Sequence, residues 1–570
     1  MSDWKRFLAD PVIAYFSMEI GLSVDIPTYS GGLGILAGDT IKAAADLQLP
    51  MVAITLASRK GYFRQSIDGQ GWQQESPSEW APEELLELMP VKALVSIENR
   101  DVKIQAWLKR VKSPTGGEVP VFFLDTDIEG NQPQDRAITD HLYGGDNEYR
   151  LKQEIVLGIG GARIIAGLGF RVRKYHMNEG HASLLTLELL NRTRRPVEDT
   201  WDERNSWEPR KVQQQCVFTT HTPVTAGHDR FPYDMVKRVL GEDVPLFLLQ
   251  ELGGKDELNL TMLALNLSRY VNGVAKKHGE VSQALFPGFE IHAITNGIHP
   301  FTWASPYMVK LFSRYFPSWG TEPELLVRVD AIPDQEIWEA HTGAKAMLFQ
   351  YVAETTGIQL DPELLTIGFA RRVATYKRGN LIFSDIERLL KIGRGKIQLL
   401  FAGKAHPHDQ PGKEIIHTII GEIEKLRGQI EIVYLENYDM QLATLLIPGV
   451  DLWLNNPMRP LEASGTSGMK AALNGVPNFS VLDGWWIEGH IEGITGWSIG
   501  PPPHGNSTDQ NHHDEDIHDL YDKLETVILP LYYEDRPGWI RVMKNAIGKN
   551  AYYFNTQSMM RRYVTEAYFR

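Results

Sequence analysis

A cluster of cations is the first feature of this 570-residue chain with a clear chemical use. The segment FARRVATYKR (residues 369–378) places four cations within eight residues, directly after an apolar run typical of a buried strand. Most basic clusters are solvated helix faces, and that remains the alternative here. However, this one follows the carboxyl end of a predicted strand, where open α/β sheets bind ligands, and the whole chain carries a net charge of −14. We therefore predict an anion site in which Arg372 holds a phosphate bidentately and Lys377 acts as a point charge.

A single lysine in a segment of small residues is the second feature. The segment EASGTSGMKAALNG (residues 462–475) runs into a helical pattern in which Lys470 has Met469 and Ala471 as neighbours. A solvated helix residue is the ordinary interpretation, but these neighbours favour a side chain that points inward. A buried lysine can form a Schiff base with an aldehyde cofactor, and the hydroxyls of Thr466 and Ser467 can bind a cofactor phosphate.

Two glycine-rich segments have different interpretations. YSGGLG (residues 29–34) precedes a predicted helix at 36–47, so its N–H groups can approach an anion at a helix N-terminus, although a simple turn is the alternative. GIGGAR (residues 158–163) resembles a dinucleotide fingerprint, but Arg163 occupies the sixth position and no strand precedes it. We predict helix packing through small residues for this second segment.

Histidines occur in three polar contexts. HMNEGH (176–181) and HTPVTAGH (221–228) follow apolar runs and are candidates either for a polar pocket or for structural histidines. The third group comprises His504 and the segment HHDEDIH (512–518), within the most loop-like part of the chain, residues 501–519. We interpret this group as a solvated loop and predict no metal site, because its spacing matches no known ligand set.

The elements that must position these residues alternate in the manner of an α/β protein. Short apolar runs predict strands, several of them buried on both faces as in parallel sheets, at 12–16, 51–55, 121–124, 217–219, 365–369, 397–401 and 430–434. Amphipathic stretches predict helices at 258–276, 335–355 and 412–426. A domain boundary is expected near residues 296–303, and the stretch 538–570 reads as helix that packs back on an earlier domain.

Composition excludes several classes of protein. Apolar residues make up 43% and charged residues 23%, which is ordinary globular usage. The acidic balance argues against nucleic acid as a partner. One cysteine, Cys216, excludes an intrachain disulfide, the first residues have no apolar signal region, and the apolar stretch 155–170 is too short to span a bilayer. We therefore expect a cytoplasmic protein with no membrane association.

Together these motifs resemble the α-glucan phosphorylases (glycogen, starch and maltodextrin phosphorylases, in a short prokaryotic-type form), retaining glycosyltransferases that use pyridoxal 5'-phosphate. The stretch YLENYDMQLATLLIPGVDLWLNNPMRPLEASGTSGMKAALNG (434–475) is similar almost throughout to the family's cofactor region. YFSMEIGL, GGLG, DNEYRLKQE, NEGH, HTPV, YVNGVA, TNGI, RRVATYKR and FAGKAHP appear in the family's order. The resemblance covers about residues 12–484.

The resemblance implies the α/β fold named GT-B, in which two Rossmann-like domains face each other across a cleft and a C-terminal helix crosses back. It suggests a glucan- and phosphate-binding domain at 1–297, a cofactor domain at 298–537 and the returning segment at 538–570. It implies phosphorolysis of terminal α-1,4-glucosidic bonds by inorganic phosphate, which gives glucose 1-phosphate. The cofactor's own phosphate would serve as proton relay, and oligomeric state is left open.

The resemblance also implies a role for each matching residue. Lys470 would carry the cofactor, and the catalytic group would be Lys470, Arg372, Lys377 and His221. The cofactor would be held by Gly31, Gly32, Arg371, Tyr438, Thr466 and Ser467. Inorganic phosphate would be bound by Gly32, Arg372 and Lys377. The glucan would be contacted by His221, Asn296, Glu462, Ser464 and Gly465, with Glu179 and His181 towards the acceptor.

The sequence departs from the family pattern at a few positions. Ser467 and Gly468 stand where many members have Gly-Asn, and Asp439 stands where those members usually carry arginine. HTPVTAGHDRF and DGWWIEG also resemble glycogen and starch synthases, so a transferase that uses a nucleotide sugar is the closest alternative function. A non-catalytic glucan-binding protein, using some of the 14 tryptophans to stack on sugars, is a third.

Overall fold

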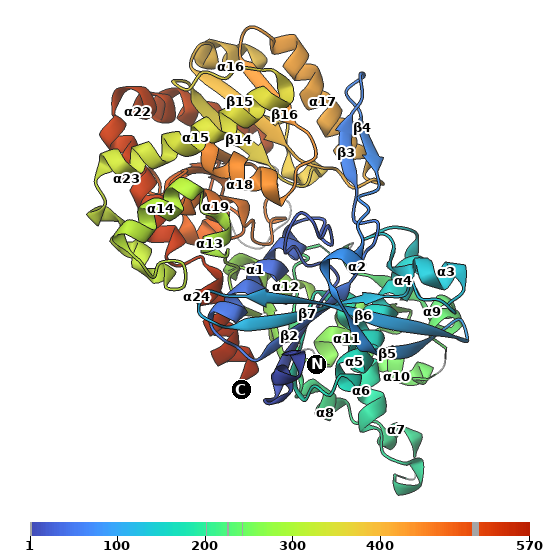
Figure 1. The fold of residues 1–570 in the computed structure, drawn as a ribbon. Coiled ribbons are helices and arrows are strands. Elements are labelled where there is room, and N and C mark those ends of the chain that lie inside the picture. The colour runs from blue at the N-terminus through green and yellow to red at the C-terminus, as the bar shows by residue number, and fades with distance from the viewer. Residues whose placement is uncertain (1–2, 201, 225–226, 242, 504–511, 570) are drawn as a thin grey trace.

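Two sheets organise the chain into two lobes in a computed structural model (Figure 1). The structure describes the chain except residues 1–2, 201, 225–226, 242, 504–511 and 570. The first sheet has nine strands in the order β13-β12-β9-β8-β1-β2-β7-β6-β5. Its bounds are β1 Val12–Ser17, β2 Met51–Leu56, β5 Glu87–Ile97, β6 Arg100–Lys112, β7 Glu118–Asp125, β8 Val172–Asn178, β9 Cys216–Thr219, β12 Tyr270–Gly273 and β13 His292–Ala293.

The second sheet is parallel throughout, with six strands in the order β16-β15-β14-β17-β18-β19. Every residue of β14 and β15 is buried, which explains their continuous apolar runs. The bounds are β14 Leu365–Ala370, β15 Ile397–Ala402, β16 Glu431–Leu435, β17 Leu452–Asn455, β18 Asn478–Val481 and β19 Gly496–Ile499.

Helices accompany both sheets. Those of the first lobe include α1 Gly32–Asp46, α4 Asn147–Ile155, α5 Gly161–Gly167, α6 Leu185–Thr193, α11 Leu260–Asn266 and α12 Lys276–Leu285. Those of the second include α13 Pro300–Trp303, α14 Pro306–Tyr315, α15 Asp334–Thr356, α16 Ile386–Gly393, α17 Gln410–Leu426, α18 Met440–Gly449, α19 Ser467–Leu473, α20 Trp486–Gly489, α21 His513–Lys523, α22 Leu529–Glu534 and α23 Arg536–Asn545.

Two segments cross between the lobes. The hairpin of β3 (Arg64–Ile67) and β4 (Gln73–Ser76) leaves the first lobe and lies beside α17 of the second (Figure 1). The amides of Gln65 and Gln73 donate to the carbonyls of Gly403 and Ala405, at 2.7 and 2.9 Å. In the other direction, α24 (Thr556–Arg562) and the π-helical segment Tyr563–Tyr568 pack on the first sheet, where Tyr568 Oη lies 2.7 Å from His176 Nδ1. The chain therefore ends on the lobe in which it begins.

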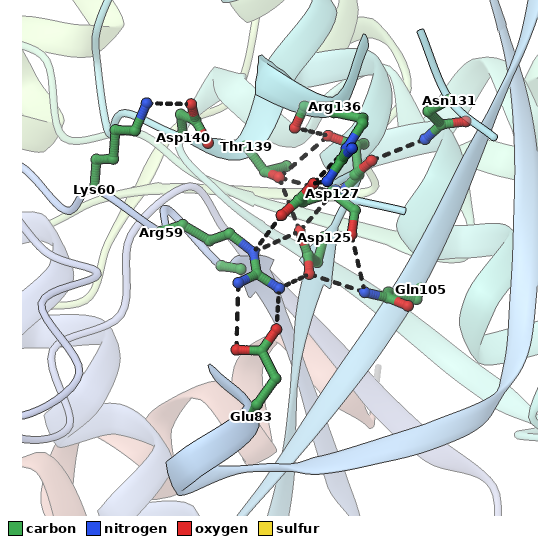
Figure 2. Close-up of polar contacts among 12 residues, drawn as sticks. Arg59, Lys60, Glu83, Gln105, Asp125, Asp127, Asn131, Arg136, Thr139 and Asp140 are labelled. Atoms are coloured by element: carbon green, nitrogen blue, oxygen red, sulfur yellow. Dashed lines mark hydrogen bonds and ion pairs between the residues drawn. The ribbon is translucent and has the colours of Figure 1, made fainter. Parts of the chain in front are cut away.

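A network of charged side chains, which we call the brace cluster, joins the ends of two strands of the first sheet (Figure 2). It comprises Arg59, Lys60, Glu83, Asp125, Asp127, Arg136 and Asp140. Asp125, the last residue of β7, is completely buried and accepts hydrogen bonds from Arg59, Gln105 and Trp107, at 2.8, 3.0 and 2.9 Å. The cluster holds the loop after β2 against residues 137–145, and both segments reach the cavity described below.

Most predicted elements are confirmed, including all seven strands and the helices at 335–355 and 412–426, within three residues of the predicted ends. The helix predicted at 258–276 is confirmed for Leu260–Asn266 (α11) and wrong beyond it, because Tyr270–Gly273 is the strand β12, which pairs with β9. The loop predicted at 501–519 is wrong from His513 on. There α21 begins with three acidic residues in its first turn, which the helix dipole favours, and Asp516 pairs with Arg378 and Arg459. His504 lies outside the described residues.

The segment 158–163 is helical and packs closely, as predicted, since a Cβ on Gly158 would lie 2.6 Å from the backbone nitrogen of Leu185. The domain limits at 297 and 537 stay a prediction. None of the helices in the described ranges has the length and apolar character needed to cross a bilayer.

Candidate active site

One cavity of about 820 Å³ is lined by loops of both lobes. The loops that follow β1, β8 and β9 reach it from the first sheet, and those that follow β14, β15 and β16 reach it from the second. This is the edge at which parallel sheets bind ligands. All sixteen residues predicted from the sequence line it: Gly31, Gly32, Glu179, His181, His221, Asn296, Arg371, Arg372, Lys377, Tyr438, Glu462, Ser464, Gly465, Thr466, Ser467 and Lys470. Their individual roles stay predictions.

Two of the cations after β14 share a single carboxylate, and we call Arg371, Arg372, Lys377 and Glu462 the cavity cluster. Glu462 Oε2 lies 2.5 Å from Arg371 Nη2 and 2.6 Å from Lys377 Nζ. Burial alone would raise the pKa of Glu462, but these two cations lower it to about 2. In the described part of the chain, no hydrogen bond or ion pair holds the Arg372 guanidinium, which is exposed to the cavity. The cluster therefore retains capacity for an anion.

Lys470 points inward, as its neighbours predicted. It lies on the short helix α19, where Met469, Ala471, Ala472 and Leu473 are all buried. Its Nζ is 3.5 Å from the centre of the Trp303 ring. Burial lowers the pKa of Lys470 to about 8, with Lys42 acting in the same direction and Asp39 opposing. With this pKa, the Lys470 amine is neutral in a fraction of the molecules near pH 7, and only the neutral amine can act as a nucleophile.

The glycine segment at the start of α1 meets a carboxylate that the sequence did not single out. Glu19 Oε2 accepts hydrogen bonds from the N–H groups of Ser30 and Gly31, at 2.6 and 3.2 Å. The Gly31 N–H is therefore already engaged, which leaves Gly32 as the better candidate for an anion. Apart from neighbouring backbone, none of the described residues has an atom within 4 Å of the Cβ positions of Gly31 and Gly32, so the space beside them is open to a ligand.

Buried histidines and carboxylates line the other side of the cavity. Glu179 Oε2 accepts from the N–H of His221 and from Thr222 Oγ1, at 2.7 and 3.0 Å. Glu179 has a φ of 72°, a strained conformation for a residue with a side chain, which these bonds hold in place. Burial lowers the pKa of His221 to about 3, so its ring is neutral, and its Nε2 lies 2.6 Å from Asn178 Oδ1. His181 lies 3.5 Å from Asp229.

Four buried polar atoms of predicted site residues have no hydrogen-bond partner among the residues that the structure describes. They are Arg371 Nε, Asn296 Oδ1, Ser464 Oγ and His181 Nδ1. Buried polar groups are almost always paired, so unpaired atoms gathered around one cavity indicate a polar ligand.

The departures from the family pattern have local structural reasons. A Cβ on Gly468 would lie 2.3 Å from Asn478 Oδ1, so this position requires glycine here. Asp439 caps α18, since its side chain accepts from the N–H of Leu442 at 2.8 Å. Ser467 Oγ accepts from the Trp453 indole at 3.2 Å, which leaves its hydroxyl hydrogen available.

Sequence reasoning missed several residues that line the cavity. Glu19, Lys404 and His406 stand inside quoted motifs without a predicted role, Trp303 only ends the expected boundary at 296–303, and Tyr62 and Tyr143 are in no predicted motif. Burial lowers the pKa of Lys404 to about 8, and its Nζ donates to the carbonyl of Phe63 at 3.0 Å. The signal available for Lys404 was its position, because this lysine stands in a segment that directly follows a predicted strand.

The mixed first sheet, the parallel second sheet, the cavity that loops of both lobes line and the returning C-terminal helix define an α/β protein of the GT-B type. Comparison with known proteins then identifies the family. Residues 246–492 match the family described as carbohydrate phosphorylase. A maltodextrin phosphorylase of Thermococcus litoralis is 40% identical over 98% of this chain and 70% of its own length. Glycogen phosphorylases of Mycobacterium tuberculosis and Aquifex aeolicus are 38% and 37% identical over 98% of this chain, and over 70% and 86% of their own lengths. The chain belongs to the carbohydrate phosphorylase family.

Proposed function

We propose that this protein is an α-glucan phosphorylase that transfers the terminal glucosyl unit of an α-1,4-glucan to inorganic phosphate. The products are α-D-glucose 1-phosphate, formed with retention, and a glucan one unit shorter. One observation carries the proposal. The same cavity is lined by an inward-pointing lysine, Lys470, and by the cavity cluster, in which the cations outnumber the carboxylates. The names of the relatives agree with it, and none of those reported is a synthase.

The residues present fit pyridoxal 5'-phosphate. Lys470 supplies a buried amine without a carboxylate partner among the described residues, and Tyr438 lines the same cavity. Arg371 Nε is buried and unpaired, while Thr466 and Ser467 lie at the start of α19. When bound, the cofactor supplies a second phosphate that relays a proton to and from the attacking one.

The chain's own groups would bind and orient the substrates. Arg372 and Lys377, with the N–H of Gly32, would hold inorganic phosphate, and their charges would offset the repulsion between two neighbouring phosphates. The glucosyl unit would be bound by His221, Asn296, Glu462, Ser464 and Gly465. Of these, Asn296 and Ser464 offer unpaired polar atoms. Glu179 and His181 would lie towards the acceptor. Walls from both lobes would exclude water, which otherwise competes with phosphate for the anomeric carbon.

The test is to incubate the protein, loaded with pyridoxal 5'-phosphate, with maltooligosaccharides and inorganic phosphate. We expect release of glucose 1-phosphate in the α configuration, and borohydride reduction should fix the cofactor on Lys470. Lys470→Ala should abolish both results, and Lys396→Ala, which alters a lysine of the loop before β15 that does not line the cavity, is the matched control. Chain growth from a nucleotide glucose with no release by phosphate would replace this proposal with the synthase.

We also propose a cytoplasmic location, which the single buried thiol of Cys216 supports because it needs no oxidising compartment.

A further inference from the structure

Helix α1 carries a buried charged face that the proposed reaction does not use. Asp39, Lys42 and Asp46 lie three and four residues apart, so they share one side of the helix. Asp39 is only 1% exposed. Three charged residues on a buried helix face are costly, so each must find partners there.

Most of the partners belong to residues 299–303, which include the short helix α13. Asp39 Oδ2 accepts from the Trp303 indole N–H at 2.7 Å and from the His299 N–H at 3.1 Å. Lys42 Nζ donates to Thr302 Oγ1 at 3.1 Å. Asp46 Oδ2 lies 2.9 Å from His299 Nε2 and accepts from Gln557.

This face reaches Lys470 through one side chain. The Trp303 indole is bonded to Asp39 at its edge, while its ring face lies 3.5 Å from Lys470 Nζ. A cation over an indole is attracted to the negative face of the ring. The hydrogen bond from Nε1 to a carboxylate fixes the plane of the ring and increases the electron density on that face.

We propose that Asp39 is a positioning residue for Lys470, acting through Trp303 to hold the lysine amine where it meets its aldehyde cofactor. The inference rests on the proposed function, in which Lys470 carries pyridoxal 5'-phosphate. In that attachment the ammonium first loses a proton to the buffer. The amine nitrogen then bonds to the aldehyde carbon, and the carbonyl oxygen leaves as water, so atoms and charge balance.

The charges that act on Lys470 have opposite effects. Lys42 lowers the pKa of Lys470, as burial does, and Asp39 raises it. His299 and Asp46 lie one step further away and pair with each other. Asp39 therefore opposes loss of the lysine proton while it fixes the amine in place, and the two effects can be separated by substitution.

The experiment uses the full-length chain freed of cofactor. One measurement is the pH dependence of acylation of Lys470 by a small amine-directed reagent, followed by peptide mass spectrometry. The other is the rate of capture of added pyridoxal 5'-phosphate, followed by absorbance and confirmed by borohydride reduction. The variants are Asp39→Asn, Asp39→Ala, Trp303→Phe and Trp303→Leu, with Asp46→Asn as the matched control on the same helix.

We expect Asp39→Asn to lower the midpoint of the acylation profile by about half a pH unit or more, because a negative charge is removed near Lys470. Trp303→Phe keeps the ring but loses the hydrogen bond, and it should slow cofactor capture severalfold with little change in midpoint. Trp303→Leu should slow capture by about tenfold or more. Asp46→Asn should match the wild type in both measurements.

Equal midpoints and capture rates in wild type, Asp39→Asn and Trp303→Phe would overturn the inference and leave Asp39 a purely structural tie. An equal shift in Asp46→Asn would overturn it too. If Asp39→Ala does not fold, the Trp303 variants, which retain the carboxylate, still decide the outcome. Failure of the proposed function is distinguishable, because pyridoxal 5'-phosphate would then not be captured at all, whereas the acylation profile would still respond to Asp39.

Discussion

Two charged clusters occupy comparable places in the two sheets, and they are used differently. The brace cluster lies where β2 and β7 end, and the cavity cluster lies where β14 ends (Figure 2 shows the former). In the brace cluster, three cations face four carboxylates, and every charge has a partner within the protein. In the cavity cluster, Arg371 and Lys377 share Glu462, while no hydrogen bond or ion pair among the described residues holds the Arg372 guanidinium.

The difference teaches that the number of internal partners, rather than the number of charges, separates a structural cluster from a binding site. A fully paired cluster has nothing left to offer a ligand and contributes to holding loops in place. A cluster with more cations than carboxylates needs an external anion. We therefore expect substitutions in the brace cluster to change stability, and substitutions in the cavity cluster to change the binding of phosphate.

The largest expected effect is on stability, at Asp125 of the brace cluster. Asp125→Ala leaves Arg59, Gln105 and Trp107 without their shared acceptor, and loss of one partner of a buried ion pair costs about 3–5 kcal/mol. Urea unfolding should show this as an earlier first transition, and Asp125→Asn should lose less. The kcat/KM of the folded enzyme should change less than threefold. A loss of phosphate affinity without a loss of stability would contradict the comparison.

The next effect is a pH dependence that has opposite signs in the two lobes. Asp483 accepts hydrogen bonds from the N–H groups of Glu462 and Gly484, and burial raises its pKa to about 7. The folded protein then binds more protons than the unfolded chain between pH 4 and pH 7, so this group lowers stability by about 2–4 kcal/mol as pH rises through that window. Asp483→Asn should remove that slope.

Asp125 shows the reverse behaviour. Burial alone would raise its pKa, but Arg59 brings it below the ordinary value. Its contribution is complete above the unfolded pKa and is lost as pH falls through the folded one. Thermal melts at pH 3 to 8 on Asp483→Asn and Asp125→Asn should therefore flatten opposite limbs of the stability curve, and identical profiles would refute the assignment.

Arg372 provides the third test, on binding rather than stability. Arg372→Ala removes a bidentate, charge-assisted contact with phosphate, worth about 1.5–3 kcal/mol, so kcat/KM for phosphate should fall roughly tenfold to a hundredfold. Arg372→Lys should recover only part, because a point charge cannot reproduce the fork. Phosphate should raise the melting temperature of the wild type but not of Arg372→Ala. Normal phosphate kinetics in Arg372→Ala would mean that the cluster is a solvated face.

The sequence predicted the cavity cluster better than the brace cluster, for a physical reason. The cations of the cavity cluster are contiguous, so they are visible as RRVATYKR, and Lys470 stands among buried neighbours that indicate its direction. The partners Arg59, Glu83 and Asp125 are separated by 24 to 66 residues, and only strand pairing brings them together. The same holds for Asp39 and Trp303, which are 264 residues apart.

Errors in the predicted elements have a related cause. YVNG continues an amphipathic pattern, but β12 forms because an edge of β9 is available to pair with it. The start of α21 is polar and rich in histidine and aspartate, yet Asp516 is buried between two arginines from distant segments. In both cases a tertiary contact overrode a local preference.

The smallest expected effect concerns the outer pair of the brace cluster. Lys60 Nζ lies 2.7 Å from Asp140 Oδ2, and the two side chains are 39% and 18% exposed. The pair is therefore screened by water and salt, and an exposed pair of this kind contributes about 0.2–1 kcal/mol. Lys60→Met, which keeps most of the aliphatic chain, should lower the free energy of unfolding by no more than that, and 0.5 M salt should abolish the difference.

A double-mutant cycle of Lys60→Met with Asp125→Asn should be additive within about 0.5 kcal/mol, because the two side chains share no partner. A coupling energy above 1 kcal/mol would mean that the brace cluster acts as a single network, and that its outer charges contribute to holding the loop after β2 at the cavity.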